Sequence, residues 1–149
     1  MSDERLILLI EDNPTDVRLI RRALTKASVV NPVQVVADGD LAVAYLSGEP
    51  PFVDRQAHPL PGLILLDLKL PKRSGLEVLQ WAKAQPVLSR IPIVILTSSR
   101  MPGDVHAAYD GHANSYLVKP VEFDELQRMM AAVNGFWIRE AEPPADSGY

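Results

Sequence analysis

The chain has 149 residues, of which 47% are apolar, and it carries a formal net charge of −4 and no cysteine. This length allows one domain with a substantial core and is too short for two ordinary domains. The negative charge disfavours non-specific nucleic-acid binding, and the lack of cysteine excludes disulfides and cysteine metal sites. The N-terminus has mixed charge and the first apolar run, 6–10, is short. We therefore expect no signal peptide, no membrane segment and a cytoplasmic location.

The first third of the chain shows two strand patterns, each followed by a helix pattern. The continuous apolar run at 6–10 is typical of a strand that is covered on both faces. Asn13 and Pro14 follow it, and they favour a helix start because Asn caps helices and Pro suits the first helical position. A second strand is expected at 33–37, and a helix around 40–46.

The middle of the chain repeats this alternation after a long connection. The segment 47–61 holds four prolines and is expected to be a surface loop. A third strand is expected at 63–66 and a helix around 76–84, and a fourth strand is expected at 91–96.

The last third predicts one more strand between two helices. A short helix is expected near 104–109, a fifth strand at 115–118 and a final helix from about residue 122. Five strands that alternate with five helices indicate an α/β protein with an open parallel sheet covered on both faces. We expect the flavodoxin-like (βα)5 arrangement with strand order 2-1-3-4-5.

Residues that carry chemistry stand directly after the apolar runs. Glu11 and Asp12 follow the first, Asp67 the third, Thr97 the fourth and Lys119 the fifth. The carboxyl ends of parallel strands lie along one edge of the sheet, so these side chains should share one crevice. The cluster of carboxylates calls for a hard cation, and Mg²⁺ typically binds one or two carboxylates together with a phosphate. Asp67 could then act as a nucleophile toward a phosphoryl donor, with the metal and Lys119 neutralising the phosphoryl oxygens.

Five sequence pieces, in this order, resemble the receiver domain of two-component response regulators. The resemblance runs from about residue 6 to residue 133. The pieces are 8–13 (LLIEDN), 65–71 (LLDLKLP), 74–75 (SG), 95–98 (ILTS) and 116–120 (YLVKP).

The resemblance implies a role for each matching position. Asp67 would be the phosphoacceptor of a phosphorelay, and Lys119 would contact the phosphoryl group. Thr97 and Tyr116 would form the switch pair, which rearranges on phosphorylation and alters the face made by the fourth helix, fifth strand and fifth helix. The Mg²⁺ ligands would be Glu11, Asp12, Asp67 and the backbone carbonyl of Lys69.

Finer features resemble small regulators that pair with phytochrome-type histidine kinases. These features are 13–18 (NPTDVR), the proline-bearing loop, 112–116 (HANSY) and the late Phe136-Trp137. One departure is Lys69, where many receivers carry Asn. The role of its backbone carbonyl is unaffected, whereas its side chain is expected to alter how water reaches the phosphoryl group.

The receiver domain is expected to span residues 1–138, with a flexible tail at 139–149. Because no output domain follows, the protein should act by binding its histidine kinase, a partner or a second copy of itself, without contacting nucleic acid directly. The apolar residues Phe136, Trp137 and Ile138 are expected either to form a homodimer interface or to cover their own domain.

Two other functions remain open from the residues alone. A phosphohydrolase of the haloacid dehalogenase type also uses a strand-end Asp, a hydroxyl, a Lys and Mg²⁺. That family places its nucleophile after the first strand with a second Asp two residues on, whereas here Asp67 follows the third strand and Lys69 stands at the second position. The other alternative is a pseudo-receiver that binds partners without phosphorylation.

Overall fold

The computed structural model describes residues 5–140. Its core is a parallel five-stranded sheet in the order β2-β1-β3-β4-β5, which confirms the predicted fold and strand order. In this register Ile10 pairs with Val36 on one side and Leu66 on the other, so these strands end level with one another. The strands are β1 (Ile7–Ile10), β2 (Val33–Val36), β3 (Leu63–Leu66), β4 (Ile93–Thr97) and β5 (Ser115–Val118).

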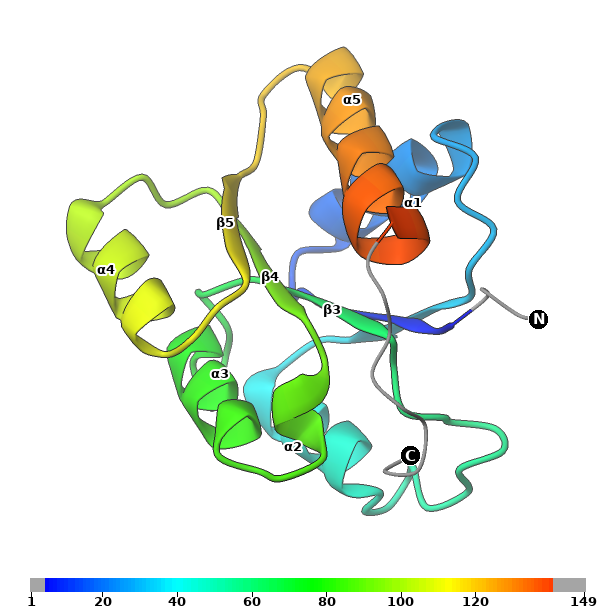
Figure 1. Cartoon of the computed structure of the whole chain (residues 1–149), viewed down its shortest axis with the longest axis vertical. Helices are drawn as coiled ribbons and strands as arrows, with labels where there is room; N and C mark the ends of the chain where they lie inside the picture. Colours follow the sequence, from blue (N-terminus) through cyan, green and yellow to red (C-terminus); the bar gives the residue numbers. More distant parts are fainter. Residues whose placement is uncertain (1–4, 141–149) are drawn as a thin grey trace.

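Helices cover both faces of the sheet, as Figure 1 shows, with α1 beside α5 on one face and α2 and α3 on the other. Ile7 and Leu9 of β1 pack with α1 and α5, whereas Leu8 and Ile10 pack with α2, α3 and α4. This alternation follows from the two-residue period of a strand. The helices are α1 (Pro14–Lys26), α2 (Gly39–Ser47), α3 (Gly75–Lys83), α4 (Pro102–Asp110) and α5 (Phe123–Val133), with a 3₁₀ turn at Leu88–Arg90. Within residues 5–140, no helix combines the length and apolar character needed to span a membrane.

The expected start of the fourth strand at residue 91 was wrong by two residues. The ladder with β3 begins at Ile93, and the backbone amide of Ile64 donates to the carbonyl of Pro92. Pro92 has no N–H to donate, so strand pairing starts only after it. The strand also ends one residue later than expected, so that Thr97 is the last residue of β4 and not the first residue beyond it.

Three helices that follow β1, β2 and β3 begin with a side-chain cap. The Asn13 carbonyl oxygen accepts from the first-turn amides of α1, and Asp38 does the same for α2. In α3, Ser74 and Glu77 form a reciprocal capping box. In the described chain, the residues before α4 and α5, Met101 and Glu122, make no side-chain cap hydrogen bond. The helices therefore differ in how firmly their N-termini are fixed.

The proline-bearing loop after α2 is tied to the domain more closely than a plain surface loop. Arg55 donates to the α2 carbonyls of Tyr45 and Leu46, at 2.7 and 2.8 Å, and so closes the helix end. The Tyr45 hydroxyl donates to the Pro59 carbonyl at 2.8 Å, and Phe52 is buried against the Tyr45 ring.

The chain continues past α5 in a π-helical segment, Asn134–Glu140. Trp137 and Ile138 pack against the core between the sheet and the α1–α5 layer, so part of the late apolar stripe does cover its own domain. Phe136 points outward with 58% of its surface exposed. The expected domain end at residue 138 lies inside this segment, and the expected tail lies mainly at 141–149, outside the described residues.

Candidate functional site

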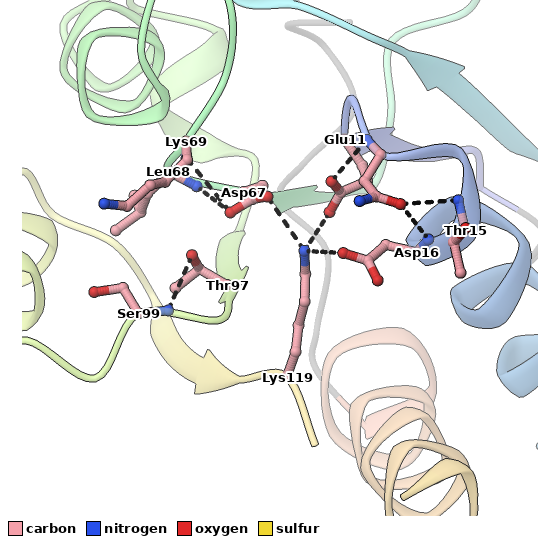
Figure 2. A network of polar contacts seen from close by, with 10 residues as sticks. Glu11, Thr15, Asp16, Asp67, Leu68, Lys69, Thr97, Ser99 and Lys119 are labelled. Atoms are coloured by element: carbon pink, nitrogen blue, oxygen red, sulfur yellow. Dashed lines mark hydrogen bonds and ion pairs between the residues drawn. The ribbon is translucent and has the colours of Figure 1, made fainter. Parts of the chain in front are cut away.

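The polar residues predicted at the strand ends meet at the carboxyl edge of the sheet. Glu11, Asp67 and Lys119 directly follow β1, β3 and β5, and Thr97 ends β4 (Figure 2). Because β1, β3, β4 and β5 are neighbours, side chains more than 100 positions apart in the chain come into contact, as Lys119 does with Glu11. The edge of an open α/β sheet is where ligands bind in this class of fold.

The Asp67 carboxylate is buried and held in one orientation. One carboxylate oxygen, Oδ1, accepts from the backbone amides of Leu68 at 2.7 Å and Lys69 at 3.4 Å. The residue is only 8% exposed. Gly75 at the start of α3 lies against its backbone, since a Cβ there would stand 2.1 Å from the Asp67 carbonyl oxygen. The second oxygen, Oδ2, is left facing the centre of the site.

Lys119 places its ammonium group among three carboxylates. Its Nζ lies 2.6 Å from Glu11 Oε1, 2.9 Å from Asp16 Oδ2 and 3.2 Å from Asp67 Oδ2. Burial by itself lowers the pKa of Lys119, but the hydrogen bonds that it donates to Glu11 and Asp16 and the charge of Asp67 outweigh this effect and raise the pKa. Lys119 is therefore a permanent cation at neutral pH.

Glu11 is the most deeply buried carboxylate of the site, with 2% of its surface exposed. Burial raises its pKa, the Lys119 ammonium lowers it, and the nearby Asp67 charge raises it again, with a net upward shift. Its second oxygen accepts from the Asn13 amide at 3.1 Å, just before α1. Glu11 thus links Lys119 to the N-terminus of α1.

The residues expected to bind the metal lie together. Glu11, Asp12 and Asp67 each offer an oxygen, and these oxygens lie within 4.8 Å of one another. Asp12 is exposed, whereas the other two are buried. Carboxylate oxygens are the donors that Mg²⁺ and Mn²⁺ prefer, and the negative charge of this group exceeds the single charge of Lys119. The donor set therefore fits a divalent hard cation.

Asp16 was not predicted as a site residue. Its carboxylate reaches Lys119 from the first turn of α1, next to the capping residue Asn13. The signal that could have found it is the cap itself: a helix that starts at Pro14 puts Asp16 in its first turn, close to the acidic pair that follows β1. Four carboxylates, and not three, surround this site.

Thr97 and Tyr116 are joined through the backbone of Ser99. The Ser99 amide donates to Thr97 Oγ1 at 3.5 Å, and the Tyr116 hydroxyl donates to the Ser99 carbonyl at 3.0 Å. The Ser99 hydroxyl donates a hydrogen bond to Asp104 in the first turn of α4. A chain of contacts therefore runs from the buried Thr97 through the β4–α4 loop to both α4 and β5. No sequence pattern indicated that Ser99 takes part in this chain of contacts.

Known proteins share this arrangement over most of the chain. Response regulator Rcp1 of a Synechocystis species is 39% identical over 149 residues, which covers 97% of this chain and 99% of the relative. A crystal structure of Rcp1 in its Mn²⁺-bound form covers 95% of this chain and 99% of its own, with a TM-score of 0.85 and 38% identity.

Two further structures of phytochrome-linked regulators are similar. The phosphorylated cyanobacterial phytochrome response regulator RcpA has a TM-score of 0.88 and 39% identity, over 95% of this chain and 99% of its own. The bacteriophytochrome response regulator RtBRR has a TM-score of 0.76 and 44% identity, over 94% of this chain and 84% of its own. The family model described as the response regulator receiver domain matches residues 7–131 of this chain. The strand order, the strand-end residues and these similarities agree: the chain belongs to the response regulator receiver domain family.

Proposed function

We propose that this protein is a response regulator that accepts a phosphoryl group from a histidine kinase on Asp67. The observation that carries the proposal is the setting of that carboxylate. Oδ1 is fixed by two backbone amides, and Oδ2 lies 3.2 Å from a permanent ammonium group beside a cluster of carboxylates. A buried, oriented carboxylate whose second oxygen faces a cation is suited to nucleophilic attack on phosphorus.

In the transfer, an Asp67 carboxylate oxygen forms a bond to phosphorus while the phosphorus–nitrogen bond of the kinase phosphohistidine breaks. The departing imidazole nitrogen keeps the bonding electrons and takes up a proton. Lys119 donates a hydrogen bond to one phosphoryl oxygen, and the Thr97 hydroxyl turns and donates to another. These donors act at the point where negative charge accumulates.

Glu11, Asp12, Asp67 and the backbone carbonyl of Lys69 would hold Mg²⁺. When bound, the cation neutralises charge on the phosphoryl oxygens. The fit of the donor set and the Mn²⁺-bound form of Rcp1 support this assignment. The backbone amide of Lys69 contacts Asp67 and the residue is exposed, so its side chain would influence the approach of water and hence the lifetime of the phosphorylated state.

Phosphorylation would be read on the face made by α4, β5 and α5. When Thr97 turns toward the phosphoryl group it gives up its contact with the Ser99 amide, and Ser99 is also bound to Tyr116 and α4. Exposed apolar side chains lie in or beside these elements, namely Met101, Tyr109 and Val121. A modest change in contacts at Ser99 is enough to shift the balance between two arrangements of this face.

The similarity to RcpA and RtBRR supports a phytochrome-type histidine kinase as the partner. The outward position of Phe136 supports a homodimer in which this ring packs on a second copy of the chain. The negative net charge agrees with action through proteins and not through direct contact with nucleic acid.

The direct test is incubation with Mg²⁺ and acetyl phosphate, followed by intact-mass measurement. The wild type should gain one phosphoryl group and Asp67→Asn none. Asp40→Asn, which removes an exposed carboxylate from the first turn of α2, is the matched control and should gain one. A wild type that gains nothing would make this chain a pseudo-receiver. Repeated turnover of a generic phosphate ester would make it a phosphohydrolase.

A further inference from the structure

Asp16 holds Lys119 from the side of α1. Its Oδ2 lies 2.9 Å from Nζ, closer than the 3.2 Å between Nζ and Asp67 Oδ2. In Figure 2 the Lys119 ammonium stands between Asp67 on one side and Asp16 on the other. Asp16 does not belong to the carboxylate group that fits a metal. The contact with Lys119 is the one polar contact of its side chain that is described at the site.

The ammonium group has no donor to spare. A lysine side chain carries three N–H bonds, and here Glu11, Asp16 and Asp67 each take one. To donate to a phosphoryl oxygen on Asp67, Lys119 must loosen one of these contacts. Glu11 is buried and is also fixed by the Asn13 amide, whereas the Asp16 side chain is 32% exposed and can turn to water. The Asp16 contact is therefore the one that yields.

We propose that Asp16 is a positioning residue that restrains the phosphorylation of Asp67, by holding Lys119 toward α1 and by adding a negative charge that opposes an anionic phosphoryl donor. This inference rests on the proposed phosphorylation of Asp67 and adds to it a residue outside the expected phosphoacceptor, metal and switch set. Removal of the Asp16 charge weakens this contact, so that an N–H of Lys119 is released more readily to the phosphoryl group.

The contact distances bound the size of the effect. Asp16 Oδ2 and Asp67 Oδ2 both contact Nζ, so they stand at most about 6 Å apart. At that separation in water, the repulsion between the Asp16 charge and a single negative charge on the donor slows phosphorylation roughly threefold. A doubly charged donor or a less polar site makes this factor larger. Asp16→Asn should therefore be phosphorylated about three- to tenfold faster than wild type.

A merely structural role predicts the opposite direction. Asp16 lies in the first turn of α1, where a negative charge stabilises the helix. Its loss would loosen α1 and, with it, the end of β1 that carries Glu11. Such damage slows phosphorylation, so an increase in rate cannot come from a weakened fold.

The experiment measures the phosphorylation rate of the full chain by intact mass at saturating Mg²⁺, over a series of acetyl phosphate concentrations. This separates the apparent affinity for the donor from the maximal rate. The variants are Asp16→Asn, which is isosteric and neutral, and Asp16→Glu, which keeps the charge. Asp40→Asn removes one charge from another helix start at the same edge of the sheet and is the control.

The expected result is a higher maximal rate and a tighter apparent affinity for Asp16→Asn, with Asp16→Glu closer to wild type and Asp40→Asn unchanged. A phosphorylation rate of Asp16→Asn that is unchanged or slower than that of wild type overturns the inference. An equal increase in the rate of Asp40→Asn also overturns it, because the effect would then come from the net charge of the protein. If wild type itself takes up no phosphoryl group, it is the proposed function that fails. The two failures are therefore distinguishable.

Discussion

Replacement of Lys119 by methionine should destabilise the metal-free protein by about 3 kcal/mol at neutral pH, at the lower end of the cost of breaking a buried ion pair. Methionine has nearly the same length and fills the same space, so the change removes the charge and little else. Glu11 and Asp67 are both buried, and each would lose its one cation contact described at the site. For a chain of this size the loss corresponds to a fall in Tm of about 6–12 °C.

The pH dependence of this loss follows from Glu11. Burial and the Asp67 charge already raise its pKa above the ordinary 4.5 despite the opposing effect of Lys119, and removal of Lys119 raises it further. A carboxyl whose folded pKa is raised costs no stability below the unfolded pKa and costs progressively more as the pH rises through the folded pKa. The difference between variant and wild type should therefore shrink as the pH falls toward 4.5.

The assay is chemical denaturation in EDTA and in saturating Mg²⁺. Since Mg²⁺ replaces the missing positive charge, it should stabilise Lys119→Met more than it stabilises wild type. The control is Lys83→Met, because Lys83 is also partly buried but donates to two carbonyls and the Asn114 side chain, with no carboxylate among its described contacts. That variant should gain no extra stability from Mg²⁺. A Lys119→Met variant as stable as wild type in EDTA, or one that Mg²⁺ does not specially rescue, would refute the reasoning.

Three further substitutions test the surroundings of the site and the exposed ring of Phe136. Gly75→Ala should unfold more easily in denaturation assays and take up phosphate more slowly in intact-mass assays, because its Cβ would collide with the backbone of Asp67. The control is Gly103→Ala, whose added Cβ would meet no neighbouring group within 4 Å and which should change neither result. Ser74→Ala removes a capping box and should cost about 1 kcal/mol in denaturation, with phosphorylation retained. Phe136→Ala should lower the sedimenting mass if this exposed ring forms the dimer, and an unchanged mass removes that role.

The strand-end residues could be predicted because their positions follow from local patterns. Continuous apolar runs mark buried parallel strands, and the residue after each run must lie at the edge where ligands bind. Glu11, Asp67 and Lys119 were placed correctly on that basis.

What the sequence could not supply were contacts between elements. Asp16 and Lys119 are 103 positions apart, and no periodicity connects them. The late apolar stripe posed a similar difficulty, because a pattern does not say whether its partner is the same chain or another. Here Trp137 packs on its own core, while Phe136 faces outward. The role of Ser99 depends on backbone groups, which carry no sequence signal.

The distribution of helix caps has a consequence for where the molecule opens first. Around Asp67 the helix starts of α1, α2 and α3 are each fixed by a side chain, and Gly75 sets α3 directly against the backbone of Asp67. Among residues 5–140, the N-termini of α4 and α5 lack such a cap, and that of α4 is held chiefly through Ser99. Local unfolding starts where fewest contacts must break. Amide exchange should therefore be faster at the starts of α4 and α5 than at the starts of α1, α2 and α3. Under the proposed phosphorylation of Asp67, the α3 side should keep its exchange rates, and the change should be confined to α4, β5 and α5.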